Sequence, residues 1–134
     1  MSKTLLVTDD AMIIREMIKE AARDAGWEIA GEATNGHEAI EQFDTLEPDA
    51  VTLDLVMPEY DGIHALKGIM QRDSSARVLV VSALEQTEIL KQAIQLGARD
   101  FIVKPFSNDQ LRVALAKIAS TESNTSIATA AAAT

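Results

Sequence analysis

The sequence contains no cysteine among its 134 residues. This absence excludes disulfide bonds, thiolate metal sites and cysteine nucleophiles, although it says little about the compartment. Basic residues are also scarce, with 12 Lys and Arg against 21 Asp and Glu, which gives a formal net charge of −9. We therefore expect no binding to nucleic acid, which requires a basic face, and no attraction to an anionic membrane surface.

Long hydrophobic runs are missing as well. Only residues 4–8 separate Met1-Ser2-Lys3 from the acidic pair Asp9-Asp10. This apolar segment is too short for a signal peptide, and acidic residues follow it too early. No later segment is apolar over the length of a membrane span. These absences predict a cytoplasmic protein that does not enter a membrane.

What is present has the composition of one ordinary globular domain, with 47% apolar residues and a mean hydropathy near zero. Short apolar runs alternate about five times with amphipathic patterns of helical period. The expected strands are 4–8, 28–32, 50–54, 77–82 and 99–103. The expected helices are 11–25, a segment between Asn35-Gly36 and Glu47-Pro48, a segment around 63–70 that Gly68 weakens, 85–96, and a last one from a capping box at Ser107 to Ile118.

This alternation predicts an α/β fold in which helices cover both faces of a parallel sheet. Right-handed crossovers restrict the topology to doubly wound orders. We assign residues 1–119 to this domain. From about Ser120 the chain is rich in Ser, Thr and Ala, and we expect 120–134 to be a low-complexity, disordered tail. An Ala-rich extension of the last helix is the alternative.

Polar residues stand just past the ends of four apolar runs. They are Asp9-Asp10, Asp54, Ser82 and Lys104-Pro105. Taken singly, each has an ordinary explanation: an aspartate or serine can cap a helix, an aspartate can form a turn, and a lysine can be a solvated charge. In a parallel sheet, however, these strand ends share one edge, where open α/β folds bind ligands.

The joint pattern is not explained by capping. Two carboxylates about 4 Å apart repel by roughly 4 kcal/mol at an effective dielectric of 20, so a cluster of three acids protonates or recruits a cation. Carboxylate oxygens with retained water suit Mg²⁺. A carboxylate beside Mg²⁺, a lysine and a hydroxyl donor is equipped for phosphoryl transfer.

These residues resemble the site of two-component response regulator receiver domains. The segment from Asp54 to Gly62 is similar to the phosphorylation loop of that family, and the resemblance covers roughly residues 3–119. It implies a flavodoxin-like fold, with a doubly wound five-stranded parallel sheet of strand order 2-1-3-4-5 and five helices. Among members of the family, the chain most resembles the stand-alone chemotaxis regulators.

The resemblance implies a role for each acid. Asp54 would be the nucleophile and the phosphorylation site, which forms an acyl phosphate. Asp10, Asp54 and the backbone carbonyl of Val56 would bind Mg²⁺, and Asp9 would hold water molecules on the ion.

The remaining site residues would act on the phosphoryl group. Lys104 would pair with one phosphoryl oxygen and Ser82 would donate to another, while Ser82 and Phe101 would form the conformational switch. The family also implies a cis peptide bond between Lys104 and Pro105. We hypothesise that the apolar side chains of Val56 and Leu84 shield the acyl phosphate from water.

The implied partners are a chemotaxis-type histidine kinase as phosphodonor, a flagellar motor switch protein or another downstream protein, and a phosphatase. We expect a monomer that is not an enzyme beyond its own phosphorylation and dephosphorylation. A phosphorelay intermediate or the receiver part of a larger regulator is the alternative, as is an interaction module that is never phosphorylated. A haloacid dehalogenase-type phosphohydrolase would have its nucleophile after the first strand, and a flavin or nucleotide module would have a Gly-rich loop there, so both are disfavoured.

Some aromatic and imidazole side chains lie outside this site. We interpret Trp27, His37 and His64 as structural or solvated residues with nothing to pair with the histidines, and leave the role of Tyr60 open.

Overall fold

Five parallel strands form one sheet at the centre of the computed structural model, which describes residues 3–83 and 87–120. The strands are β1 (Thr4–Thr8), β2 (Glu28–Ala33), β3 (Ala50–Leu53), β4 (Val78–Ala83) and β5 (Asp100–Lys104). Their spatial order is β2-β1-β3-β4-β5, and every neighbouring pair is parallel. The predicted doubly wound, flavodoxin-like fold is therefore confirmed.

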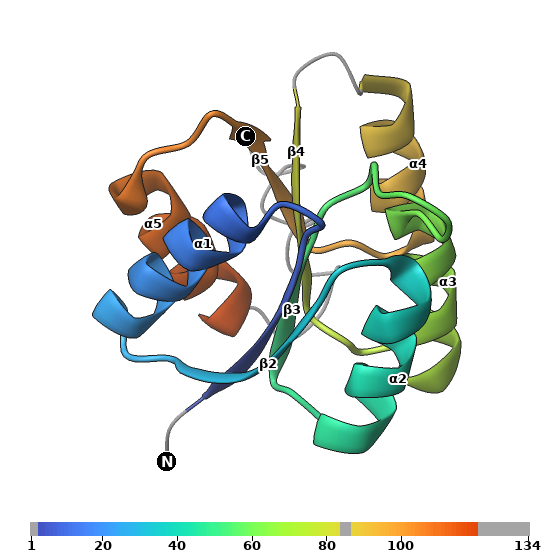
Figure 1. Cartoon of the computed structure of the whole chain (residues 1–134), viewed down its shortest axis with the longest axis horizontal. Helices are drawn as coiled ribbons and strands as arrows, with labels where there is room; N and C mark the ends of the chain where they lie inside the picture. The colour runs from blue at the N-terminus through green and yellow to red at the C-terminus, as the bar shows by residue number, and fades with distance from the viewer. Residues whose placement is uncertain (1–2, 84–86, 121–134) are drawn as a thin grey trace, which may run out of the picture.

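The helices of the described part of the chain connect these strands and cover both faces of the sheet. They are α1 (Met12–Asp24), α2 (Gly36–Leu46), α3 (Gly62–Arg72), α4 (Thr87–Leu96) and α5 (Asn108–Ser120). Helices α1 and α5 lie on one face, and α2, α3 and α4 lie on the other (Figure 1). Across the described residues, no helix combines the length and apolar character that a membrane crossing needs.

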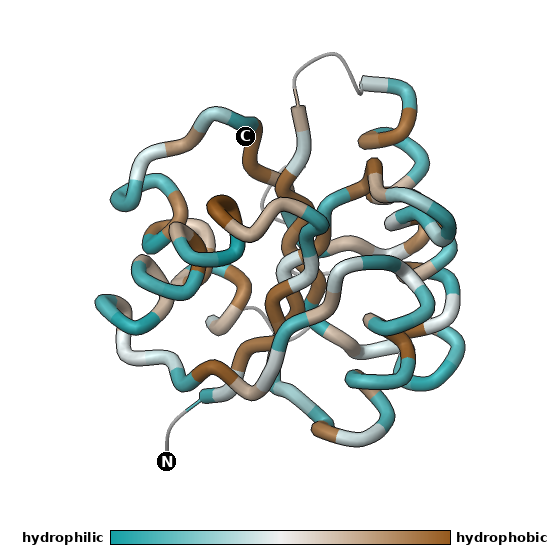
Figure 2. The backbone as a smooth tube through the Cα atoms, in the orientation of Figure 1, coloured by the Kyte–Doolittle hydropathy of each residue, from teal (hydrophilic) through white to brown (hydrophobic). Residues whose placement is uncertain are grey.

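The sheet separates two apolar layers, and its strands form the hydrophobic centre of the molecule (Figure 2). Successive side chains of a strand point to opposite faces. In β1, Leu5 and Val7 therefore pack in the layer that contains Ile18 of α1 and Leu115 of α5. Leu6 packs in the other layer, together with Leu66 of α3. Because both layers are buried, the register of the strands is fixed, and with it the position of the strand ends.

The predicted helix boundaries differ from the observed ones by small amounts. The first helix was expected over 11–25 and extends over Met12–Asp24; the fourth was expected over 85–96 and is described from Thr87. Helix α3 is continuous through Gly68. A Cβ at this position would overlap the side chain of Ile40 on α2, so the glycine allows the two helices to pack closely. Helix α5 includes Ser120, where the predicted tail begins, and residues 121–134 lie outside the described residues.

Candidate functional site

The polar residues that follow the strands meet at the carboxyl edge of the sheet. Asp9 and Asp10 come directly after β1, Asp54 comes directly after β3, and Lys104 is the last residue of β5. Strands β1 and β3 are neighbours in the sheet, but the helices that follow them lie on opposite faces. Doubly wound sheets bind their ligands at such a point, beyond the carboxyl ends of the two strands. The topology therefore places these residues where a ligand is expected.

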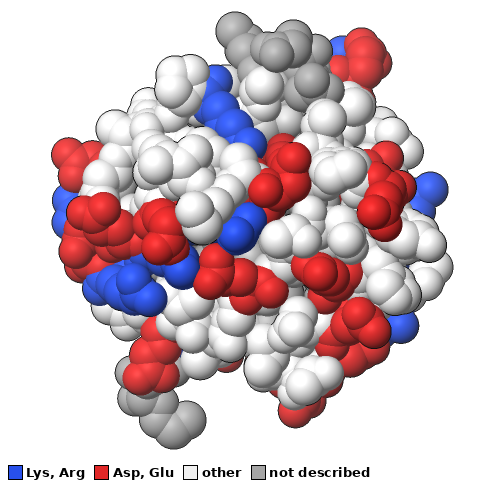
Figure 3. Space-filling view, viewed as in Figure 1, with Lys and Arg blue, Asp and Glu red and all other residues white. Residues whose placement is uncertain are grey.

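Three carboxylates form a compact group at this edge. Asp9, Asp10 and Asp54 each offer a carboxylate oxygen, and these oxygens lie within 4.8 Å of one another. Asp9 and Asp54 are buried, whereas Asp10 is exposed. On the face of the molecule in Figure 3, acidic side chains outnumber basic ones, which agrees with the formal net charge of −9. Hard oxygen donors that repel one another and remain open on one side fit a divalent cation such as Mg²⁺.

Lys104 supplies the positive charge inside this group. Its Nζ donates to Oδ2 of Asp9 at 2.8 Å and lies 3.5 Å from Oδ2 of Asp54. The Lys104 side chain is 22% exposed, so the charge is only partly screened by water. The peptide bond between Lys104 and Pro105 is cis.

Burial makes Asp54 a carboxylate that keeps its proton more readily than an exposed one. Desolvation, reinforced by the charge of Asp9, raises the pKa of Asp54 from 3.8 to about 6, and the charge of Lys104 opposes this rise. The backbone of Asp54 is held by a hydrogen bond from its N–H to the carbonyl of Thr8, at 3.0 Å. The N–H of Val56 donates to the Asp54 carboxylate at 3.3 Å. Asp54 therefore presents a fixed, partly desolvated oxygen.

The segment from Leu55 to Gly62 folds back onto Asp54. The N–H of Gly62 donates to the carbonyl of Leu55 at 3.1 Å, and a Cβ at position 62 would overlap the backbone carbonyl of Asp54. Asp61 then caps helix α3 by accepting from the N–H of His64 at 2.9 Å. The close backbone approach explains why a glycine stands at position 62.

Ser82 carries a buried hydroxyl. The residue is 0% exposed, and its Oγ makes no hydrogen bond to any residue of 3–83 or 87–120. Ser82 pairs with Val103 across the β4–β5 ladder, and the next pair in this ladder is Ala83 with Lys104. A buried hydroxyl without a hydrogen bond costs free energy, because it has lost its contacts with water. This hydroxyl would therefore gain from donating to an acceptor that enters the site.

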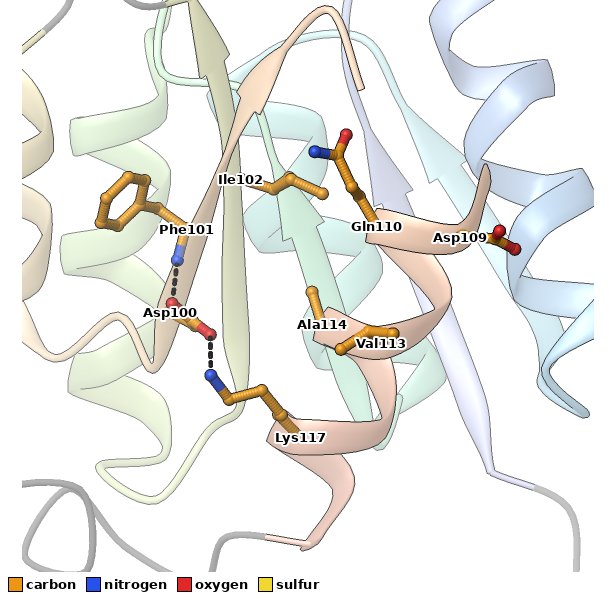
Figure 4. Close-up of a pocket in the computed structure, with 8 residues that line it drawn as sticks. All are labelled: Asp100, Phe101, Ile102, Asp109, Gln110, Val113, Ala114 and Lys117. Atoms are coloured by element: carbon orange, nitrogen blue, oxygen red, sulfur yellow. Dashed lines mark hydrogen bonds and ion pairs between the residues drawn. The ribbon is translucent and has the colours of Figure 1, made fainter. Parts of the chain in front are cut away.

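Phe101 lies on β5, between the helices α4 and α5. Its side chain points away from α5 (Figure 4), and the residue is 45% exposed. Phe101 lines a cavity of about 390 Å³ toward α5 and another of about 410 Å³ toward α4. The predicted switch pair thus consists of a buried hydroxyl and an outward-facing ring.

Several side chains outside the acidic group also bear on the sequence-based interpretations. Trp27 is buried in the core. His37 and His64 are exposed, but the expectation that nothing pairs with them is wrong. The ring of Tyr60 lies 5.4 Å from the His37 ring and 4.9 Å from the His64 ring, between centroids. Local sequence patterns did not reveal these contacts, because they join three segments of the chain.

Two further points concern the rim of the site. Val56 is 51% exposed, and Leu84, its predicted companion in shielding, lies outside the described residues. Sequence analysis missed Arg15, whose guanidinium donates to the carbonyl of Asp9 at 2.9 Å. A basic residue one turn into a helix is too common to have identified this contact from the sequence alone.

Comparison with known proteins gives one consistent result. Residues 5–116 match the model of the response regulator receiver domain. The chain is 48% identical to the chemotaxis protein CheY of Thermotoga maritima over 118 residues, which are 88% of this chain and 98% of that protein. It is 50% identical to the chemotaxis protein CheY of Listeria monocytogenes over 115 residues, which are 86% of this chain and 97% of that protein.

Solved structures agree with these relatives. A chain in the crystal structure of the CheX–CheY–BeF₃–Mg²⁺ complex from Borrelia burgdorferi superposes with a TM-score of 0.79 and 33% identity. The superposition covers 86% of this chain and 89% of that chain. The likeness therefore extends over most of both chains.

Proposed function

The chain belongs to the family of response regulator receiver domains, and from this premise we propose that it accepts a phosphoryl group on Asp54 from a histidine kinase. The observation that carries the proposal is the grouping of Asp54 with Asp9 and Asp10 around Lys104 at one sheet edge. A nucleophile, cation ligands and a fixed positive charge are the parts that phosphoryl transfer requires.

In the proposed step, a carboxylate oxygen of Asp54 attacks the phosphorus of a phosphohistidine on the kinase. The O–P bond forms as the P–N bond breaks, and the electron pair of the P–N bond stays on the imidazole nitrogen, which takes up a proton from solvent. Lys104 Nζ, which lies 3.5 Å from Asp54, would neutralise charge on the phosphoryl oxygens. The buried, unpartnered hydroxyl of Ser82 would donate to one of them.

The three acids would contribute to Mg²⁺ binding in different ways. Both oxygens of Asp9 already accept hydrogen bonds, one from the N–H of Ala11 at 2.9 Å and one from Lys104 at 2.8 Å. These bonds support a role for Asp9 as an acceptor for water molecules on the ion. Asp10, Asp54 and the carbonyl of Val56 would be the ligands, as the resemblance to receiver domains implies. When bound, Mg²⁺ supplies positive charge that offsets the negative charge of the phosphoryl oxygens.

The phosphorylation signal would reach partners through the surface formed by α4, β5 and α5. If Ser82 turns toward a phosphoryl oxygen, its side chain leaves space that the exposed ring of Phe101 can enter. Phe101 borders the cavities on both sides of β5, so its movement would reshape this surface (Figure 4). Phosphorylation would then favour a conformation that exists beforehand as a minor population.

We further propose that the pathway is chemotaxis. The relatives that support this assignment are called chemotaxis proteins, and the chain spans 97–98% of their length. The phosphodonor would be a chemotaxis-type histidine kinase, and the reader of the signal a flagellar motor switch protein. The B. burgdorferi relative forms a complex with CheX in the presence of BeF₃ and Mg²⁺, and we propose a partner for this chain that likewise acts on the activated state, such as a phosphatase.

Labelling with acetyl phosphate tests the chemistry. We expect Mg²⁺-dependent phosphorylation of the wild-type protein, loss of it in Asp54→Asn, and normal labelling in Glu59→Gln, which removes an exposed acid from the same loop. Labelling of Asp54→Asn at the wild-type level, or labelling of the wild type without divalent metal, would overturn the proposal.

Capture of partners on the beryllofluoride-activated protein tests the pathway. A motor switch protein that binds the activated form and not the Asp54→Asn form would support chemotaxis. Retention of a histidine phosphotransferase instead, with phosphoryl transfer to it, would establish a phosphorelay intermediate.

A further inference from the structure

Arg15 reaches backward along helix α1 to the acidic site. Its Nη1 donates to the backbone carbonyl of Asp9 at 2.9 Å, and its side chain is only 14% exposed. Side chains in a helix lean toward the N-terminus, so a residue in the first turn is well placed to contact the carbonyl that precedes the helix. The same residue donates its backbone N–H to the carbonyl of Ala11 at 3.1 Å, so both ends of Arg15 are fixed.

The other side of the guanidinium is held by strand β2. Arg15 Nε donates to Oε1 of Glu32 at 2.9 Å, and Lys19 Nζ donates to Oε2 of the same carboxylate at 2.9 Å. Hydrogen bonds from Lys19 and Arg15 hold the pKa of Glu32 below its ordinary value. Lys19 also contacts Glu16 on its own helix. Glu32 is therefore the centre of a network of charged hydrogen bonds that ties α1 to β2, and Arg15 connects this network to the Asp9 carbonyl.

This network acts on the turn that carries the two acids. The N–H of Asp9 donates to the carbonyl of Ala33 at 3.1 Å, and one carboxylate oxygen of Asp9 accepts from the N–H of Ala11 at 2.9 Å. Arg15 adds the bond to the remaining backbone group of Asp9, its carbonyl. That carbonyl shares a rigid peptide plane with the N–H of Asp10, so fixing it fixes the direction in which Asp10 leaves the turn.

We propose that Arg15 is a positioning residue that fixes the Asp9–Asp10 peptide and thereby aims the exposed carboxylate of Asp10 at the cation. This inference rests on the proposed function, because it assumes that Asp10 binds Mg²⁺. The planar guanidinium is needed because it directs donors to two acceptors at once, the Asp9 carbonyl and Glu32, in a fixed geometry. A lysine would keep the charge without this fork.

Electrostatics and positioning predict opposite effects when Arg15 is removed. Loss of a positive charge near a cation site should strengthen Mg²⁺ binding, whereas loss of a positioning residue should weaken it. We expect Arg15→Ala to bind Mg²⁺ roughly 10-fold more weakly than the wild type in calorimetric titration, as is typical for groups that orient metal ligands. Arg23→Ala removes the same side chain from an exposed position on α1 and should not weaken binding.

Arg15→Lys separates fork geometry from charge and serves also if Arg15→Ala does not fold. Its charge is unchanged, so electrostatics alone predicts wild-type affinity, and the positioning role predicts affinity as weak as that of Arg15→Ala. In the metal-free proteins we further expect faster amide hydrogen exchange at Asp10 and Ala11 in both variants than in the wild type.

Wild-type or tighter Mg²⁺ binding by either variant, or unchanged exchange at Asp10 and Ala11, would overturn the role of Arg15. Absence of Mg²⁺ binding by the wild-type protein would instead overturn the proposed function, so the two failures are distinguishable.

Discussion

Lys104 donates a hydrogen bond to Asp9, with 2.8 Å between Nζ of the lysine and Oδ2 of the aspartate. The pair joins the end of β5 to the end of β1, although 95 positions separate them in the chain. Asp9 is fully buried, so this ion pair replaces interactions with water that its carboxylate has lost. The lysine therefore holds the ends of β1 and β5 together as well as serving in the proposed reaction.

Replacing Lys104 should make the protein dependent on divalent cation. We expect Lys104→Met to lower the free energy of unfolding by about 2 kcal/mol in the presence of a chelator, because the buried Asp9 carboxylate loses a charged hydrogen bond from a partly exposed lysine. The same variant should bind Mg²⁺ more tightly than the wild type, since a competing positive charge is gone, and Mg²⁺ should restore most of the lost stability. Urea unfolding with and without Mg²⁺ measures both effects. Lys117→Met, which removes an exposed lysine far from the acids, is the control.

The pKa of Asp54 predicts how stability changes with pH in the metal-free protein. Consider an acid whose pKa is higher in the folded than in the unfolded state. At a pH between the two pKa values, the folded state binds more protons than the unfolded state. Here these values are about 6 and 3.8, so the free energy of unfolding should fall as the pH rises through this window and stay lower above it. The contribution is about 3 kcal/mol at most. Mg²⁺ affinity should also fall below pH 6, because protons then compete for Asp54.

Asp54→Asn checks this directly. In metal-free protein the variant should be more stable than the wild type at pH 8, by about 1–3 kcal/mol, and similar to it at about pH 4, the lower end of the window. Equal stability of the two proteins at both pH values would show that Asp54 does not titrate above its ordinary range.

How far the sequence predicts this molecule depends on the range of the interactions involved. The strands and helices follow from local periodicity, and the end of α2 at Leu46 follows from the adjacent Glu47-Pro48. The position of Asp54 at a strand end could also be predicted, because the apolar run over 50–53 ends directly before it. The strand order was inferred from family resemblance, since the alternation of strands and helices alone allows several doubly wound orders.

Contacts that join distant segments were beyond local patterns. The bond from Arg15 to Glu32 spans α1 and β2, and the rings of His37 and His64 meet Tyr60 only after α2 and α3 have packed together. The missing partner of Ser82 is likewise a property of the packed core and not of its neighbours in sequence. Side-chain direction within the folded protein decides each of these cases.

Removing the hydroxyl of Ser82 should separate stability from signalling. Because the Ser82 Oγ is buried without a partner, we expect Ser82→Ala to be as stable as the wild type within about 1 kcal/mol. Beryllofluoride should nevertheless fail to move the Phe101 ring, which NMR of that ring would report. Thr52→Val is a matched control: its hydroxyl is also buried and unpartnered, but Thr52 pairs with Val7 on the α1–α5 side of the sheet. An inward movement of Phe101 in activated Ser82→Ala would contradict the proposed switch.

A methyl group at position 62 should disturb the site through the backbone. The Cβ of an alanine there would overlap the carbonyl of Asp54, which cannot move without shifting the carboxylate. We expect Gly62→Ala to lower the free energy of unfolding by about 2–3 kcal/mol and to slow phosphorylation by acetyl phosphate.

Gly68→Ala provides the comparison, because there the Cβ would meet only side-chain atoms, of Ile40 and Arg72, and no backbone. The gain in helix propensity of about 1 kcal/mol offsets this crowding. A Gly62→Ala protein as stable and as reactive as Gly68→Ala would show that the loop tolerates the shift. Urea unfolding and labelling rates measure the difference.

The side chain of Val56 should control how long the phosphoryl group lasts. Val56 is 51% exposed beside Asp54, and its N–H donates to the Asp54 carboxylate, so its apolar side chain borders the position of the proposed acyl phosphate. An apolar group there excludes water and offers no hydrogen bond that could orient an attacking water molecule.

We expect Val56→Asn to hydrolyse the acyl phosphate several-fold faster than the wild type, with Mg²⁺ affinity unchanged because the proposed ligand at this position is the backbone carbonyl. Decay of ³²P label after removal of the phosphodonor measures the rate. Val113→Asn, which changes an exposed valine on α5, should leave the decay unchanged. An unchanged lifetime in Val56→Asn would show that the side chain does not limit access of water to Asp54.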